Sequence, residues 1–202
     1  MRAWYRVVTL LLVMGLLGGC AGKMARDGSR RQISGGDRPA WVDNPDKESS
    51  KSVKAFAGMS RQYAMESDAR TDARMNAYIQ AIDAAGMQGK RMFDQVASQV
   101  GASSDILTPG IVQDEMTRLK SQGVALGDVK QWHVEQWELL EQGSVRRYFV
   151  VHCLFQMPRD APKQFMENLL QAKAAAEADA QVRENINRAL EKMDQLQDDA
   201  RW

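Results

Sequence analysis

Two strand-like runs joined by a short turn constrain the fold of this chain more than any other feature. Residues 145–157 alternate between apolar and polar side chains, the pattern of a strand with one buried face. Residues 129–140 hold further apolar positions whose phase shifts midway, which predicts a bulge. Residues 141–144 between them place Gly143 where a left-handed backbone is favoured. The sequence therefore predicts an antiparallel hairpin with one face buried.

A third strand and a helix are expected before this hairpin. Residues 53–60 predict a short strand, in which Gly58 indicates a bulge or a close backbone approach. Ser67 is the expected N-cap of a helix that runs to about Gly86. Small side chains recur at helical spacing on one side of this helix, at Ala69, Ala73, Ala77, Ala81 and Ala84. We therefore predict a mixed α+β fold, in which a small antiparallel sheet of strand–helix–strand–strand order carries the helix on one face.

Further helices are expected in an insertion and at the C-terminus. Residues 89–103 and 111–121 predict two helical pieces, broken around Pro109. Residues 161–202 are rich in helix-forming residues and predict one long C-terminal helix. Its apolar residues form a heptad seam, typical of a coiled coil, at Val182, Ile186, Ala189, Met193, Leu196 and Ala200.

An earlier seam in the same segment is out of phase with this one, which predicts a slip near residues 177–181. A straight helix of about 40 residues is roughly 60 Å long, more than a small domain can bury. We therefore expect its distal half to project and self-associate or bind a partner. The alternative is that it folds back on its own domain.

The first 20 residues have the pattern of a secretory signal. Two positive charges, Arg2 and Arg6, precede an apolar run at residues 7–17 that is too short to span a membrane. The ending Leu-Gly-Gly-Cys resembles the lipobox of bacterial lipoproteins, which implies lipidation of Cys20 and cleavage before it. The alternative is a chance cysteine at the end of an ordinary signal.

The lipobox implies a membrane-anchored protein. We expect residues 1–19 to be the signal peptide, residues 20–38 a lipidated cysteine with a flexible tether, residues 39–160 an α+β domain, and residues 161–202 the C-terminal helix. Ala21, rather than an aspartate, follows the cysteine. In lipoproteins this implies sorting to the outer membrane, through acyl chains such as palmitate on Cys20, with the body facing the periplasm or, less often, the outside.

The charges and the candidate catalytic residues argue against two classes of function. Lys and Arg number 27 and Asp and Glu 26, without the basic excess of a nucleic-acid binder. His133 and His152 can face each other across the hairpin, but two histidines alone make a weak metal site. Cys153 points to the opposite face from His152 and is expected to be buried and inert. Asp114 and Glu115 have no visible partner in the sequence, so we predict no enzyme, metal site or cofactor.

A family resemblance rests on an ordered set of residues. They are Pro39, Trp41, Phe56, Ala57, Gly58, Ala69, Arg70, Ala73, Arg74, Ala77, Trp137, Gly143, Tyr148 and Val150. With the lipobox, they resemble the Lpp-twenty family of outer-membrane lipoproteins over about residues 39–86 and 125–157. The resemblance implies a small α+β domain that has no catalytic residues and acts by assembly. FlgP-like members of that family form rings or discs around the flagellar motor.

Three functions remain open from the sequence. The first is a structural, self-assembling envelope lipoprotein, a homo-oligomer that contacts flagellar or other envelope proteins. The second is a monomeric outer-membrane module that binds another envelope protein or the cell wall. The third is a hydrolase whose active residues the sequence does not reveal.

Overall fold

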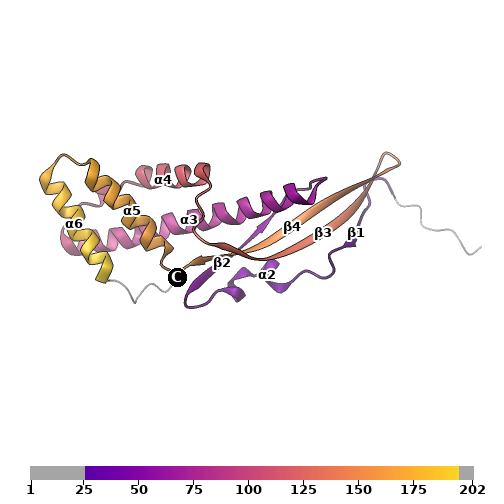
Figure 1. Ribbon diagram of the computed structural model, residues 1–202, viewed down its shortest axis with the longest axis horizontal. Helices are drawn as coiled ribbons and strands as arrows, with labels where there is room; N and C mark the ends of the chain where they lie inside the picture. Colours follow the sequence, from indigo (N-terminus) through magenta and orange to yellow (C-terminus); the bar gives the residue numbers. More distant parts are fainter. Residues whose placement is uncertain (1–25, 196–202) are drawn as a thin grey trace, which may run out of the picture.

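The computed structural model describes residues 26–195, and these form a four-stranded antiparallel sheet with helices (Figure 1). The elements are β1 (Arg30–Ser34), α2 (Ala40–Asp43), β2 (Val53–Met59), α3 (Glu66–Val100), α4 (Pro109–Gln122), β3 (Asp128–Glu141), β4 (Ser144–Pro158), α5 (Ala161–Ala176) and α6 (Ala180–Gln195). The strand order is β1-β3-β4-β2. The predicted α+β fold is confirmed. The signal peptide, Cys20 and the last part of the heptad seam lie outside the described residues.

The β3–β4 hairpin has the predicted turn. Gln142 (φ 51°) and Gly143 (φ 75°) are both left-handed, as a two-residue hairpin turn requires. The predicted bulge is present in β3, but it lies between Val129 and Gln131, near the start of the strand. The apolar phase changes later because Trp137 belongs to the other face of the sheet, opposite Tyr148.

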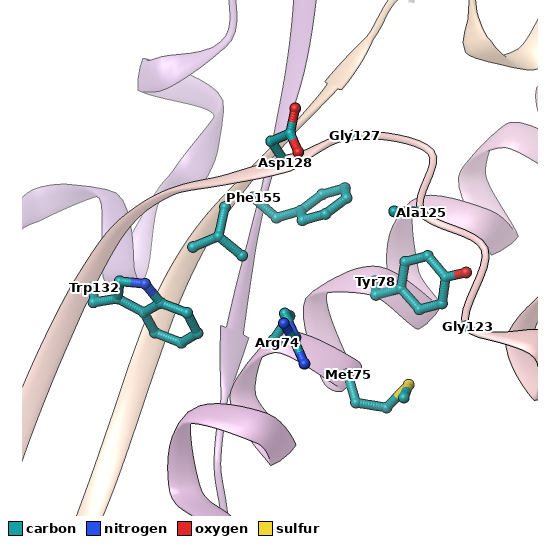
Figure 2. Close-up of a pocket in the computed structure, with 10 residues that line it drawn as sticks. Arg74, Met75, Tyr78, Gly123, Ala125, Gly127, Asp128, Trp132 and Phe155 are labelled. Atoms are coloured by element: carbon teal, nitrogen blue, oxygen red, sulfur yellow. The ribbon is translucent and has the colours of Figure 1, made fainter. Parts of the chain in front are cut away.

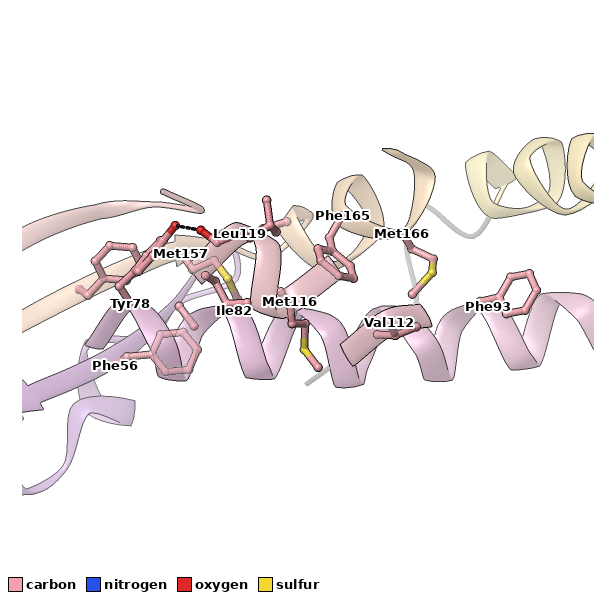
Figure 3. Packing of buried hydrophobic residues seen from close by; sticks show 14 of the residues in the cluster. Phe56, Tyr78, Ile82, Phe93, Val112, Met116, Leu119, Met157, Phe165 and Met166 are labelled. Carbon is pink, nitrogen blue, oxygen red and sulfur yellow. Dashed lines mark hydrogen bonds between the residues drawn. The ribbon is translucent and has the colours of Figure 1, made fainter. Parts of the chain in front are cut away.

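Helix α3 covers one face of the sheet through its small side chains. Ala69, Ala73, Ala77 and Ala81 are all fully buried, as the sequence predicts. Gly58 of β2 gives the close approach that was expected, because a Cβ there would meet the backbone of α3. Figure 3 shows the core continuing along α3 from the sheet to the other helices.

The expected ends of α3 are wrong at both termini. The N-cap is Met65, and Ser67 lies inside the first turn without capping it. The helix does not end near Gly86 but continues for 35 residues to Val100. At Gly86 the missing side chain makes room for Met116 of α4, and at Gly89 for the Pro162 carbonyl of α5. These glycines serve helix packing rather than termination.

The C-terminal segment is helical, as predicted, but it is divided into α5 and α6. The break at residues 177–179 falls where the two seams lose register. Ile186, Ala189 and Met193 of α6 are fully buried in the main core. The expected projection is therefore wrong for residues 180–195, and the alternative holds. The reason is that α3 extends beyond the sheet and offers α4, α5 and α6 an apolar surface (Figure 1).

Part of the expected tether is instead a strand. β1 pairs with β3 from Arg30 opposite Leu139 to Ser34 opposite Gln136. All five of its side chains are exposed, so the strand has no apolar period for the sequence to show. Backbone hydrogen bonds hold it, among them one from the Leu140 amide to the Ser29 carbonyl at 3.0 Å.

The face of the sheet away from α3 is also partly buried, so the expectation of a hairpin with one buried face is wrong. Trp41 of α2 packs on Ala55 and Leu154 in a second, smaller apolar cluster. Further along β4, Tyr148 and His152 are buried on this same face. Because polar residues such as His152 are among the buried ones on this face, the alternation in residues 145–157 wrongly indicates a solvent-exposed face.

Candidate functional site

A cleft lies between α3 and β3, and the loop that follows α4, at residues 123–127, forms a further side of it (Figure 2). Its volume is about 410 Å³. The side chains that shape it come from α3, the start of β3 and β4, and include Arg74, Met75, Tyr78, Asp128, Trp132 and Phe155. A pocket of this size with apolar walls and a few charged groups is typical of a binding site.

The aromatic wall of the cleft is fixed by contacts within the protein. The Tyr78 hydroxyl donates to the Leu119 carbonyl oxygen at 3.3 Å. The Tyr78 and Phe155 rings meet edge to face, with centroids 6.4 Å apart. The Arg70 guanidinium lies 5.0 Å from the centre of the Trp132 ring. The rings are therefore held in place by internal contacts, which lowers the entropic cost of binding.

The cleft carries two charges that the rest of the fold does not use. Among residues 26–195, neither Arg74 nor Asp128 forms an ion pair or a side-chain hydrogen bond. Both side chains are exposed, and they lie on opposite sides of the cleft in Figure 2. Arg70, one turn before Arg74, is by contrast bound to Glu66 at 2.7 Å, the pair that the sequence predicts. Arg74 and Asp128 therefore remain available to a ligand.

A second polar group lies on the opposite face of the sheet around Glu135, whose side chain is completely buried. Arg38 donates to both of its carboxylate oxygens, at 2.5 and 3.1 Å. The Trp137 indole donates to one of them at 2.9 Å. Burial acts to raise the pKa of Glu135, but these hydrogen bonds and the Arg38 charge outweigh it and lower the pKa. Glu135 is thus held as a buried carboxylate.

His133 and His152 face each other across the hairpin, as the sequence suggests, with ring centroids 5.9 Å apart. Each Nε2 lies 3.4–3.5 Å from Glu135 Oε1 without making a hydrogen bond. Burial, the largest cause, lowers the pKa of His152. Within residues 26–195 no group of three His, Cys, Asp or Glu side chains is placed to hold a metal ion. Arg38 and Trp137 already occupy the Glu135 oxygens, so this cluster stabilises the fold.

The structure also places the other residues considered from the sequence, Cys153, Asp114 and Glu115. Cys153 is fully buried on the face opposite His152, and its thiol donates to the Ala73 carbonyl oxygen at 3.3 Å. Burial raises its pKa to about 11, so it is not a nucleophile at neutral pH. Glu115 pairs with Arg118 on α4 at 2.5 Å, whereas Asp114 is exposed.

The outer face also has an open hollow of about 730 Å³ beside Glu135. Arg30, Arg38 and Arg61 lie at its margin. Arg38 is occupied by Glu135, and Arg61 lies 3.7 Å from Asp72. Two of the three arginines of this hollow are thus paired with an acid, and the third, Arg30, is exposed at its margin.

The two edges of the sheet differ. The outer edge of β2 is covered from α3, where Asn76 donates to the Met59 carbonyl oxygen at 2.8 Å. Gln80 donates in the same way to the Ala57 carbonyl oxygen at 3.2 Å. β1, at the other edge, has β3 as its single neighbour in the described sheet. Within residues 26–195, β1 and the part of β3 before Gln136, which has no partner strand on that side, therefore offer an open edge to another strand.

Sequence reasoning did not identify the cleft or the Glu135 cluster. In the sequence, the cleft is indicated by Arg70 and Arg74, which are one helical turn apart and so lie on the same side of the helix. The alternation of His133, Glu135 and Trp137 on one side of β3 was a signal for the second. In the described part of the chain, no helix has both the length and the apolar composition to cross a membrane.

Comparison with known proteins gave no relative. No family model, no curated protein and no solved structure matches this chain.

Proposed function

We propose that the chain is a lipid-anchored protein of the bacterial cell envelope, attached to the outer membrane through Cys20, whose body binds a segment of another envelope protein. The lipobox at residues 17–20 supports the anchor. One observation carries the binding role: the cleft holds an unpaired guanidinium, Arg74, beside a prearranged aromatic wall. Arginine and aromatic side chains are the residues that most often dominate the energy of protein interfaces.

The cleft chemistry favours a peptide segment as the occupant. An apolar side chain of the partner would cover the Phe155 and Trp132 rings, a carboxylate would pair with Arg74, and a cationic group would pair with Asp128. The partner's charges would thus complement those that the fold leaves unpaired. Among the described residues that line the cleft there is no Ser, Thr, Cys or His to act as a nucleophile beside Asp128, so the role we propose is non-catalytic binding.

Site-specific photo-crosslinking in the native envelope tests this function. A photoreactive residue in place of Met75, at the cleft, is expected to give one discrete product with a foreign protein. The same residue in place of Met87, another exposed methionine of α3, is the matched control and is expected to give none. Arg74→Glu is expected to abolish the Met75 product. Equal products at both positions, or a product that Arg74→Glu leaves unchanged, would contradict the proposal.

Self-assembly is the second candidate, and the open edge of β1 favours it. Two other surfaces that could serve assembly, the β2 edge and the apolar seam of α6, are largely used within the monomer. Helix α3 covers the β2 edge, and the seam residues Ile186 and Met193 are buried in the core. The five-residue β1 is short and carries Arg30 and Arg31, which oppose strand addition to a second copy. Sedimentation velocity over a hundredfold concentration range separates the two candidates: a monomer supports the binding module, and a concentration-dependent oligomer supports assembly.

A further inference from the structure

One end of the molecule is basic, and Arg26, the first described residue and the one nearest to Cys20 in the sequence, belongs to it. We call this end the basic tip and define it by Arg26, Arg30, Arg31, Val145, Arg146 and Arg147. It consists of the β3–β4 turn and the residues that lead into β1. Figure 1 places the turn and β1 at the end opposite to α5 and α6.

Hydrogen bonds fix the start of the described chain to this end. The Gly28 amide donates to the Leu140 carbonyl oxygen at 2.7 Å. The Gln142 amide, in the turn itself, donates to the Asp27 carboxylate at 2.7 Å. From Arg26 to Cys20 the chain has only six further residues, which span at most about 20 Å. Lipidation of Cys20 would thus hold the tip, and no other part of the body, close to the membrane.

Five arginines and three acids lie at the tip, so it is basic by two charges; Glu138 lies beneath two of the arginines, whereas Asp27 and Glu141 are exposed. Arg31 and Arg147 both bind Glu138, at 2.6 and 3.1 Å. Their side chains are 76% and 67% exposed, whereas that of Glu138 is 15% exposed. Their outer surfaces therefore remain cationic even though both are paired.

The remaining tip residues extend this surface. Arg146 is 58% exposed and has a 3.5 Å contact with Glu141. Arg30 has no ion-pair partner among residues 26–195. Val145, beside the turn, is an apolar side chain that is 60% exposed. Arginines around an exposed aliphatic side chain suit the boundary between phosphate headgroups and acyl chains.

We infer that the basic tip binds anionic phospholipid headgroups of the leaflet that holds the acyl chains. The inference rests on the proposed anchor at Cys20. Anionic phospholipid is the occupant because it supplies phosphate charge at the distance that the six-residue connection allows. Tip binding orients the body, so that its long axis points away from the membrane and α5 and α6 lie farthest from it. The acyl chains on Cys20 and the charged tip then both contribute to membrane binding, as a polybasic patch does beside a single acyl chain.

Vesicle co-sedimentation of the unlipidated mature chain tests the tip separately from the anchor. Residues 20–202 with Cys20→Ser contain all the described core, and they are mixed with vesicles of phosphatidylcholine alone or with added phosphatidylglycerol. At about 0.01 M salt the screening length is about 30 Å, so surface charges act fully. We expect binding to the anionic vesicles, little binding to the neutral ones, and loss of binding as salt is raised.

Charge variants locate the surface. Each arginine near an anionic membrane contributes about a fivefold change in binding. Arg30→Gln with Arg146→Gln is therefore expected to weaken vesicle binding about 25-fold. Arg183→Gln with Arg188→Gln removes the same charge from exposed positions on α6 and is expected to change binding less than twofold. Circular dichroism shows whether both variants remain folded.

Three results with vesicles would overturn the inference: equal binding to neutral and anionic vesicles, equal losses in the tip and α6 variants, or no binding at low salt. Purified cell-wall sacculi serve as the comparison surface. If the tip variants lose binding to sacculi and not to vesicles, the tip recognises the wall and the lipid inference fails. None of these results depends on acylation, so they leave the proposed anchor to its own test.

Discussion

Gly58 of β2 lies so close to Ala73 of α3 that a Cβ atom built on the glycine would stand 2.1 Å from the Ala73 carbonyl oxygen. The same atom would stand 2.6 Å from the Ala77 backbone nitrogen. Both contacts are with helix backbone, which cannot rotate away. The distance between α3 and the sheet, and with it the width of the cleft, is set by this contact and by the alanines beside it.

Gly58→Ala is expected to lower the free energy of unfolding by about 3 kcal/mol, at the upper end of the usual cost of overpacking. Urea denaturation followed by circular dichroism measures this change. Gly110→Ala is the matched control, because its Cβ would meet only the Thr108 hydroxyl at 3.7 Å. If the two variants lose equal stability, α3 does not lie as close to the sheet as described.

The pH dependence of stability is expected to show the buried His152. Burial lowers its pKa below the ordinary value of 6.5, so the unfolded chain binds more protons than the folded chain below that pH. Stability is therefore expected to fall as the pH drops from about 6.5, with a slope of up to about 1.4 kcal/mol per pH unit for this proton. Glu135, whose pKa is also lowered, adds a further loss below its ordinary value of 4.5.

His152→Gln separates this effect from the rest. The variant is expected to flatten the stability profile between pH 7 and 5 and to keep the loss below pH 4.5, which Glu135 carries. Urea denaturation at each pH provides the profile. An unchanged slope between pH 7 and 5 would contradict the assignment of this proton to His152.

The Cys153 thiol is expected to resist modification in the folded protein. It is fully buried, and its pKa of about 11 leaves little thiolate at pH 8. Reaction with a chromogenic disulfide reagent is expected to be at least about a hundredfold slower in buffer than in 6 M guanidinium chloride. The unlipidated Cys20→Ser chain provides a single thiol for this measurement. Rapid reaction under native conditions would contradict the burial.

Docking of α6 is expected to contribute to global stability. Ile186 is fully buried in the core, so Ile186→Ala is expected to cost about 2–4 kcal/mol. Asn187→Ala, at the next and exposed position, is expected to change stability by less than about 0.5 kcal/mol. Urea unfolding of dilute samples measures both. A negligible effect of Ile186→Ala would indicate that α6 projects and that its seam serves another chain.

Periodic side-chain patterns allowed much of the fold to be predicted. The alternation in β4 and the turn at Gly143 predicted the hairpin, and the small residues from Ala69 to Ala81 predicted the helix on the sheet. The sequence predicts too early an end for this helix, near Gly86, because a glycine that makes room for Met116 cannot be told in the sequence from one that ends a helix. β1 was missed because its pairing uses backbone groups, which have no side-chain signature.

The candidate site was harder to predict because its parts are distant in the sequence. Arg74 and Asp128 come to line the same cleft only when α3 packs on the sheet. Arg38 reaches Glu135 only because β1 carries the N-terminal segment across the hairpin. Local patterns give no information on such long-range contacts. The sequence therefore predicts a flexible tether over residues 20–38 and does not indicate the strand β1 within it.

The most direct test of the account is the mass of the N-terminal peptide of the protein extracted from membranes. The account predicts a tryptic peptide that begins at Cys20, ends at Lys23 and carries acyl groups on Cys20. A membrane-bound protein whose N-terminal peptide contains residues before Cys20, or an unmodified Cys20, would contradict it.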